Sequence, residues 1–367
     1  QPSTYNPLDF FQTGFNTMNS IAVSTGTETN QTHISFGAVN SEGIIDNNKY
    51  NRYNFTFRNS WDIVKNVLSM DMGLFYIKQN NQNSNGQGMY YNPLVPIYLF
   101  PPSDDINKYA VYERYDADRN FKTQYWPYGN QGLGMQNPYW IINRNMFNTD
   151  RDRYIISLSM KWNITNWLNI IGRARIDNAY TDFERKLYAS TDGLFAKSQG
   201  NYMNQEDKNT STYLDFLVNV DKKFGENYHL LVNLGGSFYD EKYKSDTFEG
   251  NLVGVPNFFH PSNIPSTESN YNKSELHTQT QSIYGKAEIG YRNFLYADVT
   301  GRIDWFSTLV GTSKEYVCYP SAGLSVILSE ILPLPEKIIS FWKIRGSYAQ
   351  VGNPPSAYLP YATVALE

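Results

Sequence analysis

Apolar and polar residues alternate along much of this chain with a period of two. Between residues 153 and 164 every second residue is apolar or aromatic, and the residues between them are mostly polar. The apolar positions are Tyr154, Ile156, Leu158, Met160, Trp162 and Ile164. This period is that of a β-strand with two unlike faces. The alternation resumes from Leu168 to Ile176 after a short polar break, which predicts a long hairpin with a tight turn.

The same pattern recurs along the chain and predicts about twelve strands. Their expected ranges are 17–25, 31–39, 50–59, 67–79, 152–164, 167–179, 210–224, 228–243, 277–291, 294–306, 318–328 and 341–350. Several are longer than the five or six residues that are usual in soluble sheets. No amphipathic helix longer than two turns is predicted, so the expected fold class is all-β.

The expected connections fall into two length classes that alternate. The short ones are 25–30, 60–66, 165–166, 225–227 and 292–293, with a longer, Pro-containing one at 330–340. The long ones are 40–49, 80–151, 181–209, 244–276 and 307–317. An outer-membrane barrel has short periplasmic turns and long extracellular loops, whereas a soluble sandwich has no reason to sort its loops by end. The pattern therefore predicts an antiparallel transmembrane β-barrel.

A barrel of this kind assigns each strand face to lipid or to the interior. Tyr154 and Trp162 bracket three apolar positions, and this stretch spans about 20 Å along the membrane normal after a strand tilt near 40°. Arg173 and Arg175 alternate with apolar residues and are expected to face the interior. The residues expected to face lipid are Ile156, Leu158, Met160, Leu168, Ile170 and Ile176.

Composition narrows the choice of partners. The chain has 367 residues, of which 16% are aromatic and 18% charged, against about 25% charged in soluble domains. The net charge of −4 gives no basic surface for a phosphate backbone, so nucleic acid is not an expected partner. The mean hydropathy of −0.52, with no long apolar run, excludes transmembrane helices but leaves half-apolar barrel strands possible.

The sequence predicts no catalytic, metal or cofactor site. A single cysteine, Cys318, and four dispersed histidines provide neither a disulfide framework nor a metal cluster. The histidines have no Ser or Cys partner at a recognised spacing, which argues against a nucleophilic triad. The Gly-rich segment 129–134 lacks the strand-to-helix context of a phosphate cradle. The acidic pairs at 104–105 and at 116 and 118 lack calcium-loop spacing and are expected to be solvated loop acids.

Three blocks in the second half of the chain resemble the barrel of SusC/RagA-like TonB-dependent transporters. The first runs from Leu295 to Trp305 (LYADVTGRIDW), the second from Tyr319 to Val326 (YPSAGLSV) and the third from Trp342 to Asn353 (WKIRGSYAQVGN). Earlier stretches agree with this resemblance: Gln136–Trp140, Asp152–Tyr154, Gly43–Ile44 and Asn51–Tyr53.

The resemblance implies an active importer in the outer membrane of a Gram-negative bacterium. Members of that family have a plug, a TonB box and a barrel of twenty-two strands, so this chain is expected to be a partial barrel of about twelve strands. Residues 1–16 would end an extracellular loop, 17–350 would form the barrel and 351–367 would begin another loop. The implied partners are TonB, acting through an N-terminal part, membrane lipid, a SusD-like lipoprotein, and an oligosaccharide or peptide substrate.

Two sets of residues are the candidate sites. The first comprises charged side chains expected to line the lumen, where they would pair with each other, hold the plug or contact substrate: Arg173, Arg175, Asp177, Asp298, Arg302 and Asp304. The second comprises rings in the loop 80–151, which is rich in aromatic and amide side chains: Tyr125, Trp126, Tyr128, Tyr139 and Trp140. Packing within the loop, contact with a lid protein and stacking on a ligand are the alternatives for these rings.

Two other classes of protein remain possible at this stage. One is a self-contained porin-like or enzymatic outer-membrane barrel, in which the first and last strands would hydrogen-bond to each other. The other is a soluble glycan-binding β protein, in which Tyr154 and Trp162 would be buried between two sheets.

Overall fold

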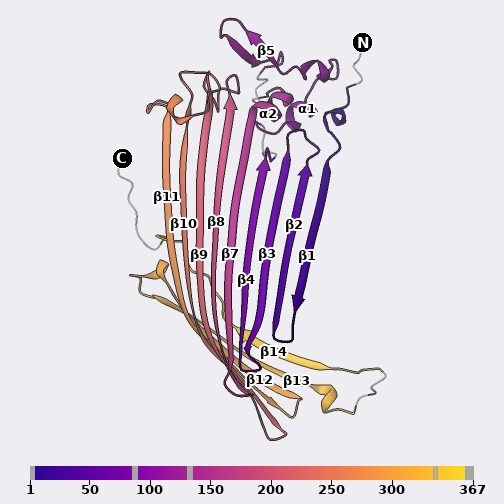
Figure 1. Cartoon of the computed structure of the whole chain (residues 1–367), viewed down its shortest axis with the longest axis vertical. Helices are drawn as coiled ribbons and strands as arrows, with labels where there is room; N and C mark the ends of the chain where they lie inside the picture. Colours follow the sequence, from indigo (N-terminus) through magenta and orange to yellow (C-terminus); the bar gives the residue numbers. More distant parts are fainter. Residues whose placement is uncertain (1–4, 85–89, 130–134, 334, 336–337, 360–367) are drawn as a thin grey trace.

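The computed structural model describes residues 5–84, 90–129, 135–333, 335 and 338–359. Twelve antiparallel strands form one sheet in which each strand pairs with its neighbours in chain order (Figure 1). They are β1 (Phe15–Gly26), β2 (Asn30–Glu42), β3 (Lys49–Val64), β4 (Leu68–Gln82), β7 (Asn145–Asn163), β8 (Leu168–Tyr188), β9 (Gly200–Phe224), β10 (Tyr228–Asn251), β11 (Ser269–Tyr291), β12 (Leu295–Phe306), β13 (Tyr316–Ile327) and β14 (Lys343–Ala349).

The remaining elements are short. Two of them, β5 (Glu113–Asp116) and β6 (Phe121–Gln124), form a separate hairpin in the longest loop. The helices are α1 (Leu94–Tyr98), α2 (Pro138–Arg144) and 3-10 turns at Pro7–Phe10, Ile106–Tyr109, Pro261–Asn263, Ser307–Leu309 and Leu328–Glu330. No helix among the described residues is long and apolar enough to cross a membrane.

The twelve predicted strands are confirmed, and the connections sort by end as expected. Loops gather at one end of the sheet, and the turns between β1 and β2, β3 and β4, and β7 and β8 lie at the other (Figure 1). The tight turns use residues that tolerate positive φ: Asn66 at 62° and Gly225 at 59°. Because a hairpin turn brings its strands back antiparallel, one continuous ladder results.

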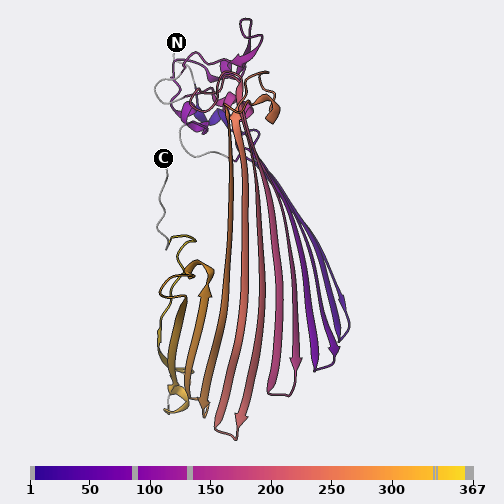
Figure 2. The ribbon, with the colours of Figure 1, turned by 90° about the vertical axis from the view of Figure 1, so that its left-hand side faces the viewer.

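The sheet is curled and open. In Figure 2, β12–β14 lie on one side and β1–β4 on the other. The hydrogen-bonded order runs from β1 to β14 without pairing those two strands to each other. The closed twelve-stranded barrel is therefore not the observed arrangement. The sheet also has no second sheet packed on it, as a soluble sandwich requires, because the only other sheet in the described part of the chain is the β5–β6 hairpin.

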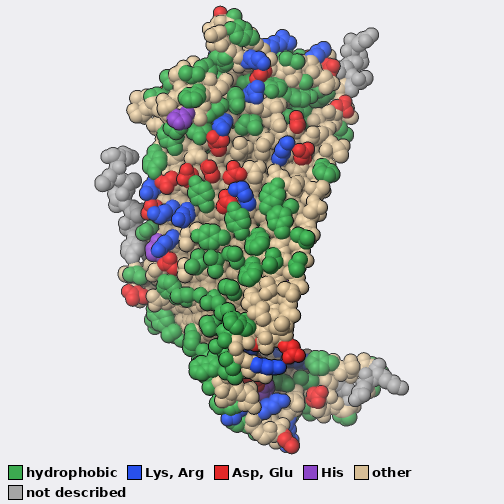
Figure 3. All heavy atoms as spheres, in the orientation of Figure 1, with side chains coloured by type: hydrophobic (Ala, Val, Ile, Leu, Met, Phe, Trp, Pro, Cys, Tyr) green, Lys and Arg blue, Asp and Glu red, His purple; other side chains and the backbone are tan. Residues whose placement is uncertain are grey.

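The sheet has an apolar face and a polar face. In the pairing of β7 with β8, Ile156 lies opposite Ile176 and Leu158 opposite Ala174, while Ser157 lies opposite Arg175. The side chains expected to face lipid share the apolar face, and Arg173 and Arg175 share the opposite, polar face. Figure 3 shows hydrophobic side chains gathered over the middle and lower part of the sheet, with charged side chains denser above them.

The strands β8 to β11 are longer than predicted, at 21, 25, 24 and 23 residues. Polar pairs join their loop-side parts: Lys244 forms an ion pair with Glu275 at 3.2 Å, and His277 forms a hydrogen bond with Asp240 at 2.6 Å. Above the apolar band both faces are polar, so the period-two signal disappears although the ladder continues. The prediction was therefore wrong at the loop-side ends: β8 and β10 end later than predicted, and β9 and β11 begin earlier.

A charge on the apolar face should destabilise the protein far more than the same charge one residue away. Val299 is 56% exposed on the apolar face of β12, and Thr300 lies on the polar face. We expect Val299→Arg to lower the free energy of unfolding by about 2–4 kcal/mol, because an arginine near the bilayer midplane is poorly solvated. We expect Thr300→Arg to change it by less than about 1 kcal/mol.

The measurement is urea unfolding of the full-length protein in lipid vesicles, followed by the heat-dependent shift in gel mobility. Equal effects of the two substitutions would contradict the assignment of the apolar face to lipid.

Candidate functional site

A connected group of charged and hydroxyl side chains comes from four strands of the polar face, β8, β9, β11 and β12. Arg173 on β8 donates from Nε to Asp215 on β9 at 2.7 Å, with a second contact at 2.6 Å. The Asp215 side chain is fully buried and also accepts hydrogen bonds from the hydroxyls of Tyr213, at 3.1 Å, and Tyr284. Arg302 lies over the Tyr284 ring, 5.4 Å from its centroid. Rings and ion pairs thus link β8 to β12.

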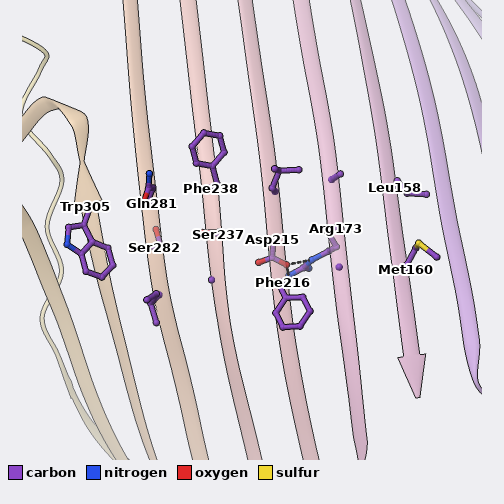
Figure 4. A pocket seen from close by; sticks show the side chains of 15 residues that line it. Leu158, Met160, Arg173, Asp215, Phe216, Ser237, Phe238, Gln281, Ser282 and Trp305 are labelled. Atoms are coloured by element: carbon purple, nitrogen blue, oxygen red, sulfur yellow. Dashed lines mark hydrogen bonds and ion pairs between the residues drawn. The ribbon is translucent and has the colours of Figure 1, made fainter. Parts of the chain in front are cut away.

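The Arg173–Asp215 pair joins β8 to β9 in Figure 4. Leu158, Phe216 and Phe238 belong to the same region of the sheet but to its apolar face, as the register of the neighbouring strands requires. One backbone layer therefore separates a mainly apolar surface from a charged one.

A second charged group lies nearer the loops on the same face. Asp177 accepts hydrogen bonds from Arg153 on β7 at 2.7 and 2.6 Å and from Arg175 at 2.8 Å. Its side chain is 11% exposed, whereas that of Arg175 is 50% exposed. The Asp177 carboxylate is thus largely shielded from solvent, and the two guanidinium groups that contact it are more exposed.

All six charged residues predicted for the lumen lie on the polar face, but they do not form one cluster. Arg302 donates to Asp304 at 2.6 Å and to Ser282 at 2.8 Å. Asp298 forms no ion pair among the described residues, and its carboxylate lies against Gly323, where a Cβ atom would come within 2.6 Å of it. The sequence did not identify Asp215, Tyr284 or Arg153, because these partners come from other strands and the cross-strand register is not visible in one sequence.

Aromatic rings of the longest loop pack against one another. Phe100, Ile106 and Tyr109 form a buried cluster that Tyr125, Trp126 and Tyr128 cover. The ring centroids of Trp126 and Tyr128 are 5.2 Å apart, and those of Tyr109 and Trp126 are 5.4 Å apart. Such edge-on and tilted contacts are favourable between aromatic rings. Part of the surface of each ring is therefore covered by other rings of the same loop.

The carboxylate of Asp104 organises this cluster. It accepts hydrogen bonds from Tyr109 and, at 2.7 Å, from the Tyr128 hydroxyl, and Lys108 donates to it at 2.9 Å. These hydrogen bonds, first that of Tyr109, then those of Lys108 and Tyr128, hold the pKa of Asp104 well below its usual range. Asp104 is therefore an ionised acceptor at neutral pH.

The helix α2 holds the other two predicted rings. Its N-cap, Asn137, accepts from the backbone N–H of Tyr139 at 2.8 Å and donates to the carbonyls of Tyr109 and Tyr125 at 2.8 and 3.0 Å. Trp140 is 1% exposed and donates from Nε1 to Thr191 at 3.0 Å. The Trp140 ring thus contributes to the interior of the loop, while Tyr139 lies between two hydrophobic clusters.

The acidic loop residues have structural partners. Asp116 accepts from the backbone N–H groups of Asp118 and Arg119 at 3.0 and 3.2 Å, which closes its own turn. Within the described part of the chain, no three His, Cys, Asp or Glu side chains are placed to hold a metal ion. Of the Gly-rich segment 129–134, only residue 129 lies among the described residues.

Comparisons with known proteins agree on the fold. A family model described as "TonB dependent receptor-like, beta-barrel" matches residues 98–365. No curated protein matches the sequence. The structure resembles the RagAB peptide importer in the "open-open" state with a TM-score of 0.75 at 15% identity, covering 95% of this chain and 38% of that chain.

Two further solved structures are similar at lower scores. The ferric-catecholate import receptor Fiu from E. coli K12 in its open form gives a TM-score of 0.53 at 10% identity, covering 85% of this chain and 51% of that chain. FpvA from P. aeruginosa gives 0.54 at 13% identity, covering 86% and 39%. At identities this low, the structural similarity shows a shared fold alone. This chain spans about 38% of the RagAB chain that it matches.

Removing the buried carboxylate of Asp215 should destabilise the sheet. We expect Asp215→Asn to lower the free energy of unfolding by about 2 kcal/mol, because Arg173 loses its buried counter-charge and an amide offers one acceptor oxygen where the carboxylate offers two. Combined with Arg173→Gln in a double-mutant cycle, it should show a coupling of about 1 kcal/mol. Asp71→Asn is the control, since Asp71 is exposed and, among the described residues, accepts a hydrogen bond only from Ser60, at 2.5 Å. Additive effects of the two substitutions would contradict the pairing.

Removing the charge of Asp104 should loosen the ring cluster but not the sheet. Because the pKa of Asp104 is lowered by folding, its contribution is present above the unfolded value of about 3.9 and fades as the pH falls below it. At pH 7 we expect Asp104→Asn to raise the rate of protease cleavage within residues 90–129, with no change in sheet unfolding. Asp118→Asn is the control, and an equal rise in cleavage with it would contradict the role of Asp104.

Proposed function

Because this chain belongs to the TonB dependent receptor-like, beta-barrel family, we propose that it forms wall and loops of an active importer of oligosaccharides or peptides. Barrels of this family lie in the outer membrane of Gram-negative bacteria, and the family consists of transporters and receptors, not of enzymes. The proposed segments are a loop end at 1–16, barrel wall at 17–350 and the start of a further loop at 351–367.

The two-faced sheet is the observation that carries this proposal. An apolar face suits contact with lipid, and a polar face with ion pairs suits a hydrated interior, where charges cost little. The long folded loops between β4 and β7, β8 and β9, and β10 and β11 share one end of the sheet, which suits capture of a solute on one side of the membrane. A soluble binding protein would have no use for the wide apolar face.

The proposed partners act at the two ends of the barrel. A SusD-like lipoprotein would close over the loop end, and TonB would act through an N-terminal part of the protein. The similarity of the fold to a protein described as a peptide importer supports the peptide alternative for the substrate.

The two candidate sites have different proposed roles. Arg173, Asp177, Arg302 and Asp304 pair with neighbours in the wall, so we assign them to wall stability and to docking of a plug ahead of substrate contact. Arg175, whose side chain is half exposed, and Asp298, which forms no ion pair with a described residue, remain candidates for the substrate path. In the loop, Tyr125, Trp126 and Tyr128 are candidates for contact with a lid or ligand, and Tyr139 and Trp140 would support them from beneath.

The test is uptake by the bacterium that carries this protein. Cells with and without the gene receive a defined mixture of peptides and oligosaccharides at limiting concentration, and the medium is analysed by mass spectrometry. We expect the deletion to slow depletion of one solute class at least tenfold, and a protonophore to do the same to intact cells. A control strain carries the deletion together with the restored gene.

Two results would contradict the proposal. Unchanged uptake in the deletion strain would remove the import function. Uptake that depends on the gene but persists with the protonophore would identify a passive channel.

A further inference from the structure

Two adjoining hollows lie on the polar face between β3 and β10. The one nearer the loops has a volume of about 500 Å³ and is lined by residues that include Arg151, Arg153 and Glu241. The other has a volume of about 460 Å³ and includes Arg58 and Asp71. Both contain Arg175 and Tyr213, so they form one continuous depression in the wall.

Small side chains create this depression. Ala179 and Ser211 form part of the first hollow, and Gly73 and Ser157 form part of the second. A Cβ atom on Gly73 would lie 2.7 Å from the Ser157 hydroxyl, so no larger residue fits there without movement of that side chain. The long arginine and tyrosine side chains stand around these short ones.

Positive charge predominates in the two hollows. The arginines 58, 151, 153, 173 and 175 line them, against the acidic residues Asp71, Asp177 and Glu241. When Asp215, which pairs with Arg173, is counted as well, the arginines still outnumber the acidic residues by one. This local excess contrasts with the net charge of −4 for the whole chain. An anion is therefore attracted to this part of the wall.

Several of these guanidinium groups have bonding capacity to spare. Arg58 and Arg151 form no ion pair with any described residue, and Arg58 lies over the Phe75 ring at 5.1 Å. Arg153 and Arg175 share one carboxylate, that of Asp177. A guanidinium has five N–H donors, so one shared carboxylate leaves most of them without a charged acceptor.

We propose that this depression binds a carboxylate group of the imported solute, an inference that rests on the proposed import function. Arginine binds a carboxylate through two parallel hydrogen bonds, which neither a neutral amide nor a hydroxyl reproduces. Tyr213 and Tyr239 also line the first hollow and contribute flat rings to it. An acidic peptide and a uronic-acid oligosaccharide both carry this group.

The first experiment uses trifluoroacetate as a small carboxylate probe, because the imported solute is not identified. Full-length protein purified in detergent is titrated with trifluoroacetate, and with neutral trifluoroethanol for comparison, while fluorine NMR line widths are recorded. We expect the dissociation constant for trifluoroacetate to rise about tenfold in the double variant Arg58→Gln/Arg151→Gln. The weak signal from trifluoroethanol should not change.

Matched controls separate binding from folding. Arg292→Gln removes an arginine from the periplasmic turn, where it bonds Asn227 at 3.0 Å, and should leave trifluoroacetate binding unchanged. Thermal unfolding is measured for every variant. Unchanged trifluoroacetate binding in the double variant, with or without a lower unfolding temperature, would overturn the proposal. An equal loss of binding in Arg292→Gln would overturn it as well.

A competition experiment then distinguishes the two sources of the carboxylate. Oligopeptides with free or amidated C-termini and oligosaccharides with or without uronic acid are added to displace trifluoroacetate. Displacement only by the carboxylate member of one pair supports the site and names the solute class, and displacement by neutral members overturns it. Because this readout needs no transport, failure of the uptake test would leave a positive binding result standing.

Discussion

Satisfaction of backbone hydrogen bonds inside a membrane is the constraint on which this structure depends. Hydrocarbon offers no partner for an N–H or C=O group, so every strand must pair along its whole length within the bilayer. The ladder from β1 to β14 achieves this for each interior strand through nearest neighbours alone. The outer edges of β1 and β14 still need strands beside them in a bilayer, and a closed barrel provides these.

The constraint also explains the asymmetry of the side chains. Once the backbone is paired, the apolar face needs only to match lipid, and its residues can vary in size among Gly172, Ala174 and Phe216. The polar face has the opposite freedom, because water and neighbouring charges solvate an arginine there. Asp215 shows the limit of this freedom: its side chain is fully buried, and it is stable as an acceptor because Arg173 and two tyrosines surround it.

The sequence predicted the strands, which share a repeating pattern, but it did not predict which side chains pair across strands. Alternation revealed all twelve strands and both faces, because one apolar face leaves a period-two signal wherever lipid contacts it. The signal ends where both faces of the sheet become polar, and β9 therefore begins ten residues before its predicted start at residue 210. The charged residues of the polar face were found as a class, but their partners were not, since Arg173 and Asp215 are 42 residues apart in the chain. The β5–β6 hairpin and α2 were missed because their short patterns lie within a loop rich in rings.

The loops obey a different rule, since water can satisfy their backbone and packing decides their shape. Asn83 fixes the start of the longest loop to its end, with its side chain accepting from the backbone N–H of Phe147 at 2.8 Å. Gln124 connects the β5–β6 hairpin to the next loop through Ser190 and accepts from the N–H of Asn137. These ties order the rings before any partner arrives. The partner proposed to close over this end would then order few side chains on binding, which would leave more of the contact free energy available for affinity.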